Sequence, residues 1–310
     1  MNVLIVERRH GDYARALAEA EPGLVLRVGD DPAALAEAAR ECPVWFGQPD
    51  AIASLLRLGG RPRWVQSTWA GITPLLADDL PRDYRLSRAV GMFGQVMAEY
   101  VLTYLLLHER QVLARLASQV ERRWDNRQPP SLAGRRLLIV GVGDIGRSVA
   151  AYLAPFGLVL DGIARRPRAV PGFDEVAGLD DLPRLAARAD YLLNLLPDTP
   201  RTQDLYDARL FARMRPEALF INAGRGSAVV EADLIAALEA ERLAGAVLDV
   251  CRVEPLPPEH PLWRAPRLLL TGHSAAPTLC GPVTALFLDN LARFRRGEPL
   301  RGELDFQRGY

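Results

Sequence analysis

Short apolar runs alternate with stretches of helical spacing along most of the 310-residue sequence, and this alternation constrains the fold more than any other feature. It is typical of parallel sheets whose faces are covered by helices. The apolar runs of the second half are almost uninterrupted, as in strands that are buried on both faces. They predict strands at 135–140, 158–164, 191–196, 218–223, 245–250 and 267–271, and helices at 143–157, 181–189, 207–214 and 231–243.

Residues 1–95 show the same alternation, which predicts a second parallel sheet. Its expected strands are 3–6, 24–28, 44–46 and 63–68, and its expected helices are 12–20 and 33–40. A long helical pattern covers 94–118, another covers 285–297, and the pair Pro129-Pro130 indicates a domain junction. The sequence therefore predicts an α/β protein with two Rossmann-like or flavodoxin-like doubly wound parallel-sheet domains.

The composition excludes several classes of function. The 38 basic residues balance the 38 acidic ones, so we expect no binding to nucleic acid and none to an anionic membrane surface. All the basic residues are arginine, because the sequence contains no lysine. Chemistry that needs a side-chain amine, such as a Schiff base, a pyridoxal phosphate anchor or a P-loop lysine, is thereby excluded.

The cysteines and histidines indicate neither a disulfide framework nor a metal site. Cys42, Cys251 and Cys280 lie far apart, and the four histidines are scattered. The N-terminus does not resemble a signal peptide, and the apolar stretch at 100–107 is too short to span a membrane. We therefore expect a cytoplasmic protein that binds no metal.

One glycine motif has the right context for a dinucleotide site. The motif reads Gly141-Val142-Gly143-Asp144-Ile145-Gly146, directly after the strand expected at 135–140 and at the start of a helix. Its first glycine permits a tight turn, its second lets a pyrophosphate approach the backbone, and its third lets the helix pack on the sheet. The helix N-terminus would then offer N–H groups to the phosphates. An ordinary glycine turn in a βα unit is the alternative.

The residues that follow the next strand favour NADP(H) over NAD(H). An NAD site places an acidic residue at the end of that strand, where it binds the ribose 2′-hydroxyl. Asp161 lies three residues too early, and the strand is followed by Arg165 and Arg166. Two guanidinium groups would bind a 2′-phosphate, whereas an acidic residue would repel it. The alternative is that both arginines are solvated surface residues.

Three polar residues follow the ends of other expected strands. Arg225 comes after the strand at 218–223, Glu254 after 245–250 and His273 after 267–271. Because ligands bind beyond the carboxyl ends of strands in an open parallel sheet, these side chains are expected to converge beside the cofactor. An arginine can bind a carboxylate, a histidine can transfer a proton, and a glutamate beside it favours the imidazolium. Each residue alone could be an ordinary loop or surface residue.

The sequence resembles the D-isomer-specific 2-hydroxyacid dehydrogenase family, and above all its glyoxylate/hydroxypyruvate reductase branch, over nearly its whole length. The stretches that carry the resemblance are GVGDIG at 141–146, LLPDTPRTQDLY at 195–206, FINAGRGSAVVEADLIAAL at 220–238, LDVCRVEPLPPEHPLW at 248–263 and TGHSAA at 271–276. The branch commonly uses NADPH, in agreement with Arg165 and Arg166. The family often has a proline before its histidine, where this chain has Gly272.

The resemblance implies roles for individual residues. Arg225 would bind the carboxylate and keto oxygen of the substrate, His273 would be the acid/base, and Glu254 would hydrogen-bond His273 and raise its pKa. The resemblance further implies that Asp249 contacts the nicotinamide carboxamide. The other residues expected to contact the cofactor are Leu196, Pro197, Thr202, Ala223, Gly224 and His273 itself.

The resemblance also implies how the first domain meets the substrate. In the loop Trp69–Ile72, the backbone N–H groups of Ala70, Gly71 and Ile72 would bind the substrate carboxylate. Trp45 is either an aromatic residue on the lid side of the substrate or a core or interface tryptophan. The substrate domain would combine residues 1–97 and 282–310, the cofactor domain would be 98–281, and the active site would lie in the cleft between them. A homodimer is expected.

The implied reaction is the reduction of a small 2-keto acid, such as glyoxylate or hydroxypyruvate, to the D-2-hydroxy acid with hydride from NADPH. Larger keto acids remain alternatives as substrates. A dinucleotide-sensing binding protein of the same fold, similar to a corepressor, is the alternative from another functional class. A methyltransferase that uses the glycine loop for S-adenosylmethionine would leave Arg225, Glu254 and His273 without a purpose.

Overall fold

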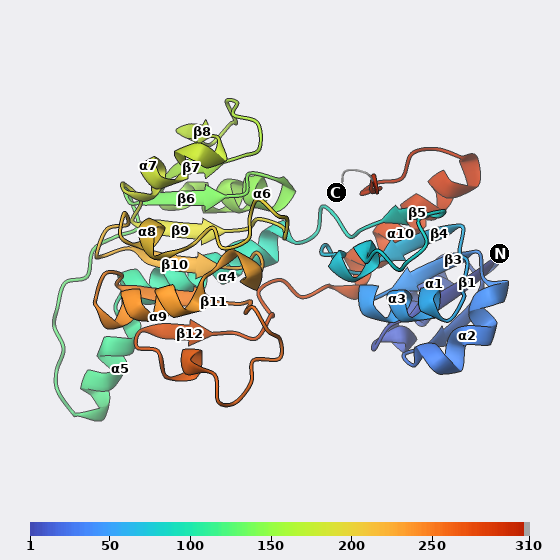
Figure 1. The fold of residues 1–310 in the computed structure, drawn as a ribbon, viewed down its shortest axis with the longest axis horizontal. Coiled ribbons are helices and arrows are strands. Elements are labelled where there is room, and N and C mark those ends of the chain that lie inside the picture. Colours follow the sequence, from blue (N-terminus) through green and yellow to red (C-terminus); the bar gives the residue numbers. More distant parts are fainter. Residues whose placement is uncertain (307–310) are drawn as a thin grey trace. The chain divides into compact units, whose positions relative to one another are not determined.

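The computed structural model describes residues 1–306, and the chain divides into two compact units (Figure 1). One unit combines Met1–Met92 with the C-terminal segment that begins at Thr278, and the other is Phe93–Pro277. The boundaries expected at 97/98 and 281/282 would have divided helices α4 (Gly94–Glu109) and α10 (Cys280–Arg296). Each helix instead belongs whole to one unit, because its backbone hydrogen bonds make it a single element.

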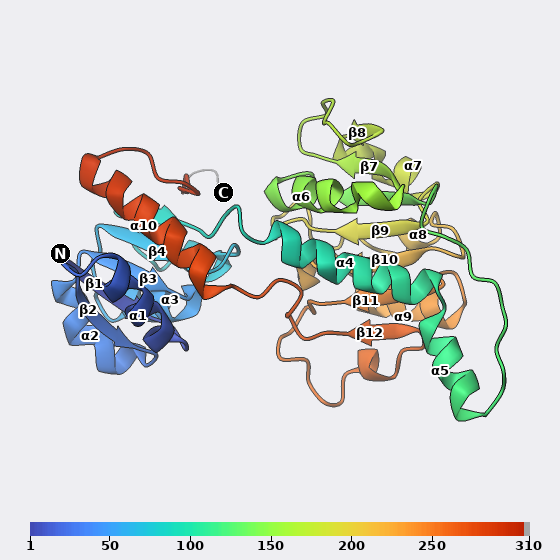
Figure 2. The same cartoon turned by 180° about the vertical axis from the view of Figure 1, so that it is seen from behind.

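The first unit is built on a five-stranded parallel sheet with the order β2-β1-β3-β4-β5. Its strands are β1 (Asn2–Val6), β2 (Val25–Gly29), β3 (Val44–Gly47), β4 (Trp64–Ser67) and β5 (Arg85–Ser87). Helices α1 (His10–Ala20) and α10 pack together on one face, and α2 (Pro32–Glu41) and α3 (Pro49–Arg57) on the other (Figures 1 and 2). This strand order is that of a flavodoxin-like doubly wound sheet.

Aromatic packing holds the C-terminal helix on the first sheet. The ring of Phe287 in α10 stacks on Phe46 of β3 and on Trp64 of β4, with centroids 4.6 and 5.2 Å apart. Phe294, two turns further along α10, stacks on Trp64 at 5.3 Å. Stacked aromatic pairs bury large apolar areas, so α10 belongs to this unit although it is distant in sequence.

The second unit is built on a seven-stranded parallel sheet with the order β12-β11-β10-β9-β6-β7-β8. Its strands are β6 (Arg136–Val140), β7 (Val159–Ile163), β8 (Glu175–Ala177), β9 (Tyr191–Asn194), β10 (Leu219–Asn222), β11 (Gly245–Leu248) and β12 (Leu268–Leu270). Its helices are α4, α5 (Val112–Val120), α6 (Asp144–Leu153), α7 (Leu182–Ala186), α8 (Ala208–Phe211) and α9 (Glu231–Glu239). The order reverses between β6 and β9, as in dinucleotide-binding folds.

The fold class predicted from the sequence is confirmed: both units are α/β with doubly wound parallel sheets. No helix within residues 1–306 is both long enough and apolar enough to cross a membrane.

Three details of the prediction are wrong. The helix expected at 94–118 is two helices, α4 and α5, because Gln111 has a left-handed backbone with φ of 53° that interrupts the hydrogen-bond ladder. The Pro129-Pro130 segment is a loop inside the second unit and not a domain junction. Helix α3 and the three-residue strands β5 and β8 were missing from the prediction.

Asp161 is a structural residue of the second sheet. It lies in the middle of β7 with no exposed surface, and its carboxylate accepts hydrogen bonds from Arg136 (2.8 Å) and Arg188 (3.0 Å). A buried carboxylate needs such partners, because transferring its charge out of water is costly. Asp161 therefore ties β6 to β7 and lies away from the strand end where an NAD ribose would bind.

We predict that Asp161→Asn lowers the free energy of unfolding by about 2–3 kcal/mol, because Arg136 and Arg188 lose the buried charge that they share. Urea unfolding followed by circular dichroism measures the change. Asp174→Asn is the matched control: this carboxylate is 3.4 Å from Arg136 but 63% exposed, so the loss should be within about 0.5 kcal/mol. Equal effects of the two variants would contradict the structural role of Asp161.

Candidate active site

The glycine motif forms a tight turn between β6 and α6. The N–H groups of Gly141 and Val142 both donate to the carbonyl of Ile163, at 3.0 Å, so the turn lies against the end of β7. Gly141 has φ of 114°, which favours glycine. A Cβ at Gly146 would lie 2.4 Å from the carbonyl oxygen of Gly141, so only glycine lets α6 approach this turn.

The space above Gly143 suits a phosphate group. A Cβ added at Gly143 would meet no atom within 4 Å, so glycine is not needed there for packing. Gly143 is also the N-cap of α6 and has no side chain to cap it. A helix N-terminus of this kind attracts anions through its N–H groups and its dipole. Directly after β7, Arg165 and Arg166 are exposed. These residues fit a dinucleotide that carries a 2′-phosphate.

Two buried asparagines, which the sequence analysis did not identify, shape the next loops. Asn194 ends β9 and Asn222 ends β10, and the amide of Asn194 donates to the side-chain oxygen of Asn222 at 2.8 Å. The side-chain oxygen of Asn194 accepts from the N–H of Leu196 (3.1 Å), and that of Asn222 also accepts from the N–H of Gly224 (3.1 Å). An asparagine within each of two consecutive apolar runs was the signal that could have marked both residues as candidates, although not their contact.

The asparagine pair also fixes the backbone at Arg225, because the amide of Asn222 donates to its carbonyl at 3.0 Å. A Cβ at Gly226 would lie 2.0 Å from the backbone of Cys251, so glycine allows the Arg225 loop to touch the loop after β11. The Arg225 guanidinium donates to the Gly224 carbonyl at 2.6 Å. Burial lowers the pKa of Arg225, and Glu254 opposes this shift; the side chain remains charged at neutral pH.

His273 and Glu254 form a hydrogen-bonded ion pair. Nδ1 of His273 lies 2.7 Å from Oε2 of Glu254, and the other carboxylate oxygen accepts from the N–H of Cys251 at 2.9 Å. The contact expected between positions 254 and 273 is therefore present. The imidazole side chain is 47% exposed, so its second ring nitrogen can meet a ligand.

The charges around this pair set its protonation state. The hydrogen bond that His273 donates to Glu254 raises the pKa of His273, while burial and the charge of Arg225 lower it and Asp249 raises it. For Glu254, burial raises the pKa, but the hydrogen bonds from His273 and Cys251 lower it further, so the net shift is downward. The pair is therefore held as imidazolium and carboxylate over a wider pH range than free side chains would be.

Asp249 braces the turn that carries His273. One oxygen of its buried carboxylate accepts from the N–H groups of Ser274 (2.8 Å) and Ala275 (3.0 Å) and from the hydroxyl of Thr271 (2.6 Å). The second oxygen accepts one hydrogen bond within residues 1–306, from the Ala275 N–H at 3.1 Å. Asp249 thus has a structural task beside the expected contact with the nicotinamide.

The remaining predicted cofactor residues lie in loops at the same edge of the sheet. Leu196 and Pro197 follow β9, and Ala223 follows β10 and donates its N–H to Asn194. Thr202 is buried, and its hydroxyl bonds to the carbonyl of Pro197 at 2.7 Å. Thr202 therefore shapes the loop, and its hydroxyl is already used there.

In the first unit, the loop after β4 presents unpaired backbone groups. Within residues 1–306, the N–H groups of Ala70, Gly71 and Ile72 have no hydrogen-bond partner. Trp69, at the start of this loop, borders a hollow of about 520 Å³ at the carboxyl ends of β1, β3 and β4. Consecutive free N–H groups of this kind can bind a carboxylate.

Trp45 is a core residue, so its expected role beside the substrate is wrong. It has no exposed surface, and its indole N–H donates to the carbonyl of Cys42 at 2.9 Å. The side chain packs within the apolar core between the sheet and helices α2 and α3. A strand that is buried on both faces shows no alternation that could tell which of its aromatic residues face a ligand, and here the core alternative holds.

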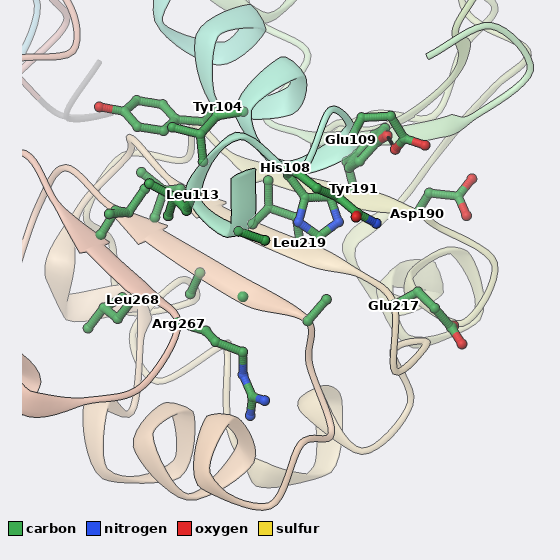
Figure 3. Close-up of a pocket in the computed structure, with 18 of the residues that line it drawn as sticks. Tyr104, His108, Glu109, Leu113, Asp190, Tyr191, Glu217, Leu219, Arg267 and Leu268 are labelled. Carbon is green, nitrogen blue, oxygen red and sulfur yellow. Dashed lines mark hydrogen bonds between the residues drawn. The ribbon is translucent and has the colours of Figure 1, made fainter. Parts of the chain in front are cut away.

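A larger cavity lies at the opposite, amino-terminal edge of the second sheet (Figure 3). It has a volume of about 720 Å³ and is lined by residues at the starts of β9 to β12 and by the end of α4 and the start of α5. It contains none of the residues expected to act in catalysis.

Comparisons with known proteins agree with this geometry. A model of the D-isomer specific 2-hydroxyacid dehydrogenase NAD binding domain matches residues 102–275. Glyoxylate/hydroxypyruvate reductase A of Serratia proteamaculans is 35% identical over 259 residues, which are 81% of this chain and 82% of the relative.

Solved structures match the whole chain. A D-isomer specific 2-hydroxyacid dehydrogenase family protein from Aeromonas salmonicida superposes with a TM-score of 0.93 and 36% identity, covering 98% of this chain and 99% of the other. The NADPH-dependent glyoxylate/hydroxypyruvate reductase of Sinorhizobium meliloti, in complex with NADP and sulfate, superposes with a TM-score of 0.88 and 31% identity, covering 100% and 99%. This chain therefore belongs to the D-isomer specific 2-hydroxyacid dehydrogenase family.

Proposed function

We propose that the protein reduces a small 2-keto acid of the glyoxylate or hydroxypyruvate type to the D-2-hydroxy acid with NADPH. The observation that carries the proposal is the 2.7 Å pair of His273 and Glu254, which lies with Arg225 at the carboxyl edge of a dinucleotide-binding sheet. A protein that only senses a dinucleotide would not need a charged imidazole–carboxylate pair beside a guanidinium.

The cofactor proposal rests on the glycine turn and the two arginines after β7. Bound NADPH would supply the hydride for the reaction. Gly143 and the N-terminus of α6 would bind its pyrophosphate, and Arg165 and Arg166 its 2′-phosphate. The Sinorhizobium meliloti relative was solved with NADP, which supports the choice of this nucleotide.

Arg225 and His273 would divide the remaining work. The Arg225 guanidinium would bind the carboxylate and stabilise the negative charge that develops on the keto oxygen. The His273 imidazolium would donate a proton to that oxygen, and Glu254 would keep the ring charged and oriented. The free N–H groups of Ala70 to Ile72 would bind the substrate carboxylate.

This assignment fixes the direction of the pH dependence. Reduction needs the imidazolium, so the rate falls as the pH rises through the pKa of His273. Because Glu254 raises that pKa, it extends reduction to higher pH. In the reverse reaction the neutral imidazole accepts the hydroxyl proton, so oxidation is favoured at high pH.

We predict that His273→Gln lowers kcat for glyoxylate reduction by about 10³-fold, since it removes the proton donor, and leaves NADPH binding nearly unchanged. Arg225→Gln should raise KM for glyoxylate and lower kcat, since both the bound and the reacting oxygen lose their cation. NADPH absorbance measures turnover, and cofactor fluorescence measures binding. His10→Gln, in the first unit, is the control and should behave as wild type. Near-native turnover by the His273 variant would rule out the mechanism.

We predict that the double variant Arg165→Gln/Arg166→Gln raises KM for NADPH by about 10–100-fold and changes KM for NADH little, because charge-assisted hydrogen bonds to the 2′-phosphate are lost. Steady-state kinetics with both cofactors measures the ratio. Arg168→Gln is the matched control, since it removes an exposed arginine from the same loop. If Arg168→Gln raises KM for NADPH as much as the double variant does, the arginines act only through general charge attraction and not through specific bonds to the 2′-phosphate.

We also propose that the protein is a homodimer, and the apolar face of α5 supports this. Leu113 and Leu116 are half exposed, and Val120 and Trp124 are 85% and 92% exposed. Leu113, Leu116 and Val120 lie on one face of α5, which borders the 720 Å³ cavity of Figure 3 through Leu113, and Trp124 follows in the loop after the helix. An exposed apolar stripe beside a hollow on the same unit would let two copies pair through the same surface, as a two-fold interface requires.

The double variant Leu113→Asp/Leu116→Asp is predicted to sediment as a monomer, because two apolar isobutyl side chains are replaced by charges that cannot be buried unpaired. Analytical ultracentrifugation compares it with the wild type, which should sediment as a dimer. Leu58→Asp, an exposed leucine at the end of α3, is the control and should leave the dimer intact. A monomeric wild type would end this proposal.

A further inference from the structure

The turn that presents His273 has an unusual backbone. Gly272 has φ of 63° and His273 has φ of 58°, so two consecutive residues are left-handed. A proline, whose ring fixes φ near about −65°, could not occupy position 272 in this conformation. Histidine adopts positive φ at a cost, and such conformations persist only where the surroundings hold them. The turn therefore needs an external support.

The carboxylate of Asp249 is that support. It accepts the N–H groups of Ser274 and Ala275, the two residues after the left-handed pair, at 2.8 and 3.0 Å. The carbonyl of Asp249 also accepts the N–H of His273. Three successive N–H groups of the turn thus bind one residue of the neighbouring strand end. Asp249 is only 4% exposed and, within residues 1–306, forms no ion pair.

Two hydroxyl groups extend this support to helix α4. The Thr271 hydroxyl lies 2.6 Å from the same oxygen of Asp249, and the Tyr100 hydroxyl lies 2.9 Å from the Thr271 hydroxyl. A carboxylate only accepts, so Thr271 gives its single proton to Asp249, and Tyr100 must donate to Thr271. Burial raises the pKa of Tyr100, which keeps this donor protonated. The chain of hydrogen bonds therefore runs in one direction, from α4 to the turn.

We infer that Tyr100 and Thr271 are positioning residues for His273: they orient the Asp249 carboxylate, which holds the left-handed turn from which the imidazole reaches Glu254. Without the hydrogen bond from the Thr271 hydroxyl, the Asp249 carboxylate that binds Ser274 and Ala275 can rotate about its bond to the rest of the side chain. Where a proline would stiffen the backbone before the histidine, this chain uses a hydrogen-bond chain instead. The inference rests on the proposed function only for its effect on turnover.

The test uses Tyr100→Phe and Thr271→Val, which remove single hydroxyl groups. Tyr104→Phe is the matched control: its ring packs on Tyr100 at 4.7 Å, one turn along α4, but its hydroxyl has no hydrogen-bond partner within residues 1–306. Thr271→Ser restores the hydroxyl and is the rescue variant. The protein has only four histidines, so the imidazole signal of His273 can be followed by NMR and assigned by its loss in His273→Gln.

The first readout is the pKa of His273 in the protein without substrate. The charged groups that face it are Glu254, Arg225 and Asp249, and Glu254 raises the pKa through its hydrogen bond. When the turn relaxes, this bond weakens, so the pKa should fall in Tyr100→Phe and Thr271→Val but not in Tyr104→Phe or Thr271→Ser. Circular dichroism checks that each variant is folded. If Thr271→Val does not fold, Tyr100→Phe alone tests the inference.

The second readout is glyoxylate reduction with NADPH. The two positioning variants should lose about 10-fold or more in kcat, since small displacements of a reacting group are costly, with little change in KM for NADPH. The fall of the rate at high pH should begin at a lower pH than in the wild type. The inference is overturned if these variants match Tyr104→Phe in the pKa of His273, or if the pKa falls while kcat of an active enzyme is unchanged.

A failure of the proposed function would look different. A wild type that reduces no 2-keto acid would contradict the function, and the NMR titration alone would then decide whether Tyr100 and Thr271 position the imidazole.

Discussion

The parallel pairing of every strand in the second sheet is the constraint on which the site depends. Because all seven strands run in one direction, their carboxyl ends and the loops that follow them emerge at one edge. Arg225, Glu254 and His273 come from three such loops, which explains how residues up to 48 positions apart in the sequence lie at one edge. The same edge carries the glycine turn, so a nucleotide bound there would meet these side chains.

Pairing alone brings the loops to the same edge, and small residues and buried amides bring them into contact. Gly226 lets the backbone of one loop touch that of the next, where any Cβ would collide with Cys251. The buried side chains of Asn194 and Asn222 hydrogen-bond to each other and accept from the N–H groups of the loops that follow their strands. Buried polar groups of this kind are favourable only when all their hydrogen bonds are made, so they specify one loop geometry.

The sequence predicted what depends on local patterns. Uninterrupted apolar runs revealed the buried strands. The position of Asp161 inside its strand, and not at its end, was enough to show that it is not the acidic residue that binds the ribose in an NAD site. The break at Gln111 was not predictable, because a single left-handed residue leaves the helical spacing on both sides intact. Trp45 was ambiguous for a similar reason: its strand is buried on both faces, so alternation could not distinguish core from ligand. The contacts of Asn194 and Asn222 depend on strand order, which no local pattern contains.

Glycine at position 272 changes how the turn that carries His273 is held. With glycine at 272, the backbone gains a left-handed conformation that proline forbids, and it loses the stiffness that proline provides. The lost stiffness must be supplied by interactions, and here Asp249 supplies it through three N–H groups. Since Asp249 is itself held by Thr271 and Tyr100, the orientation of the imidazole depends on helix α4, far away in the sequence.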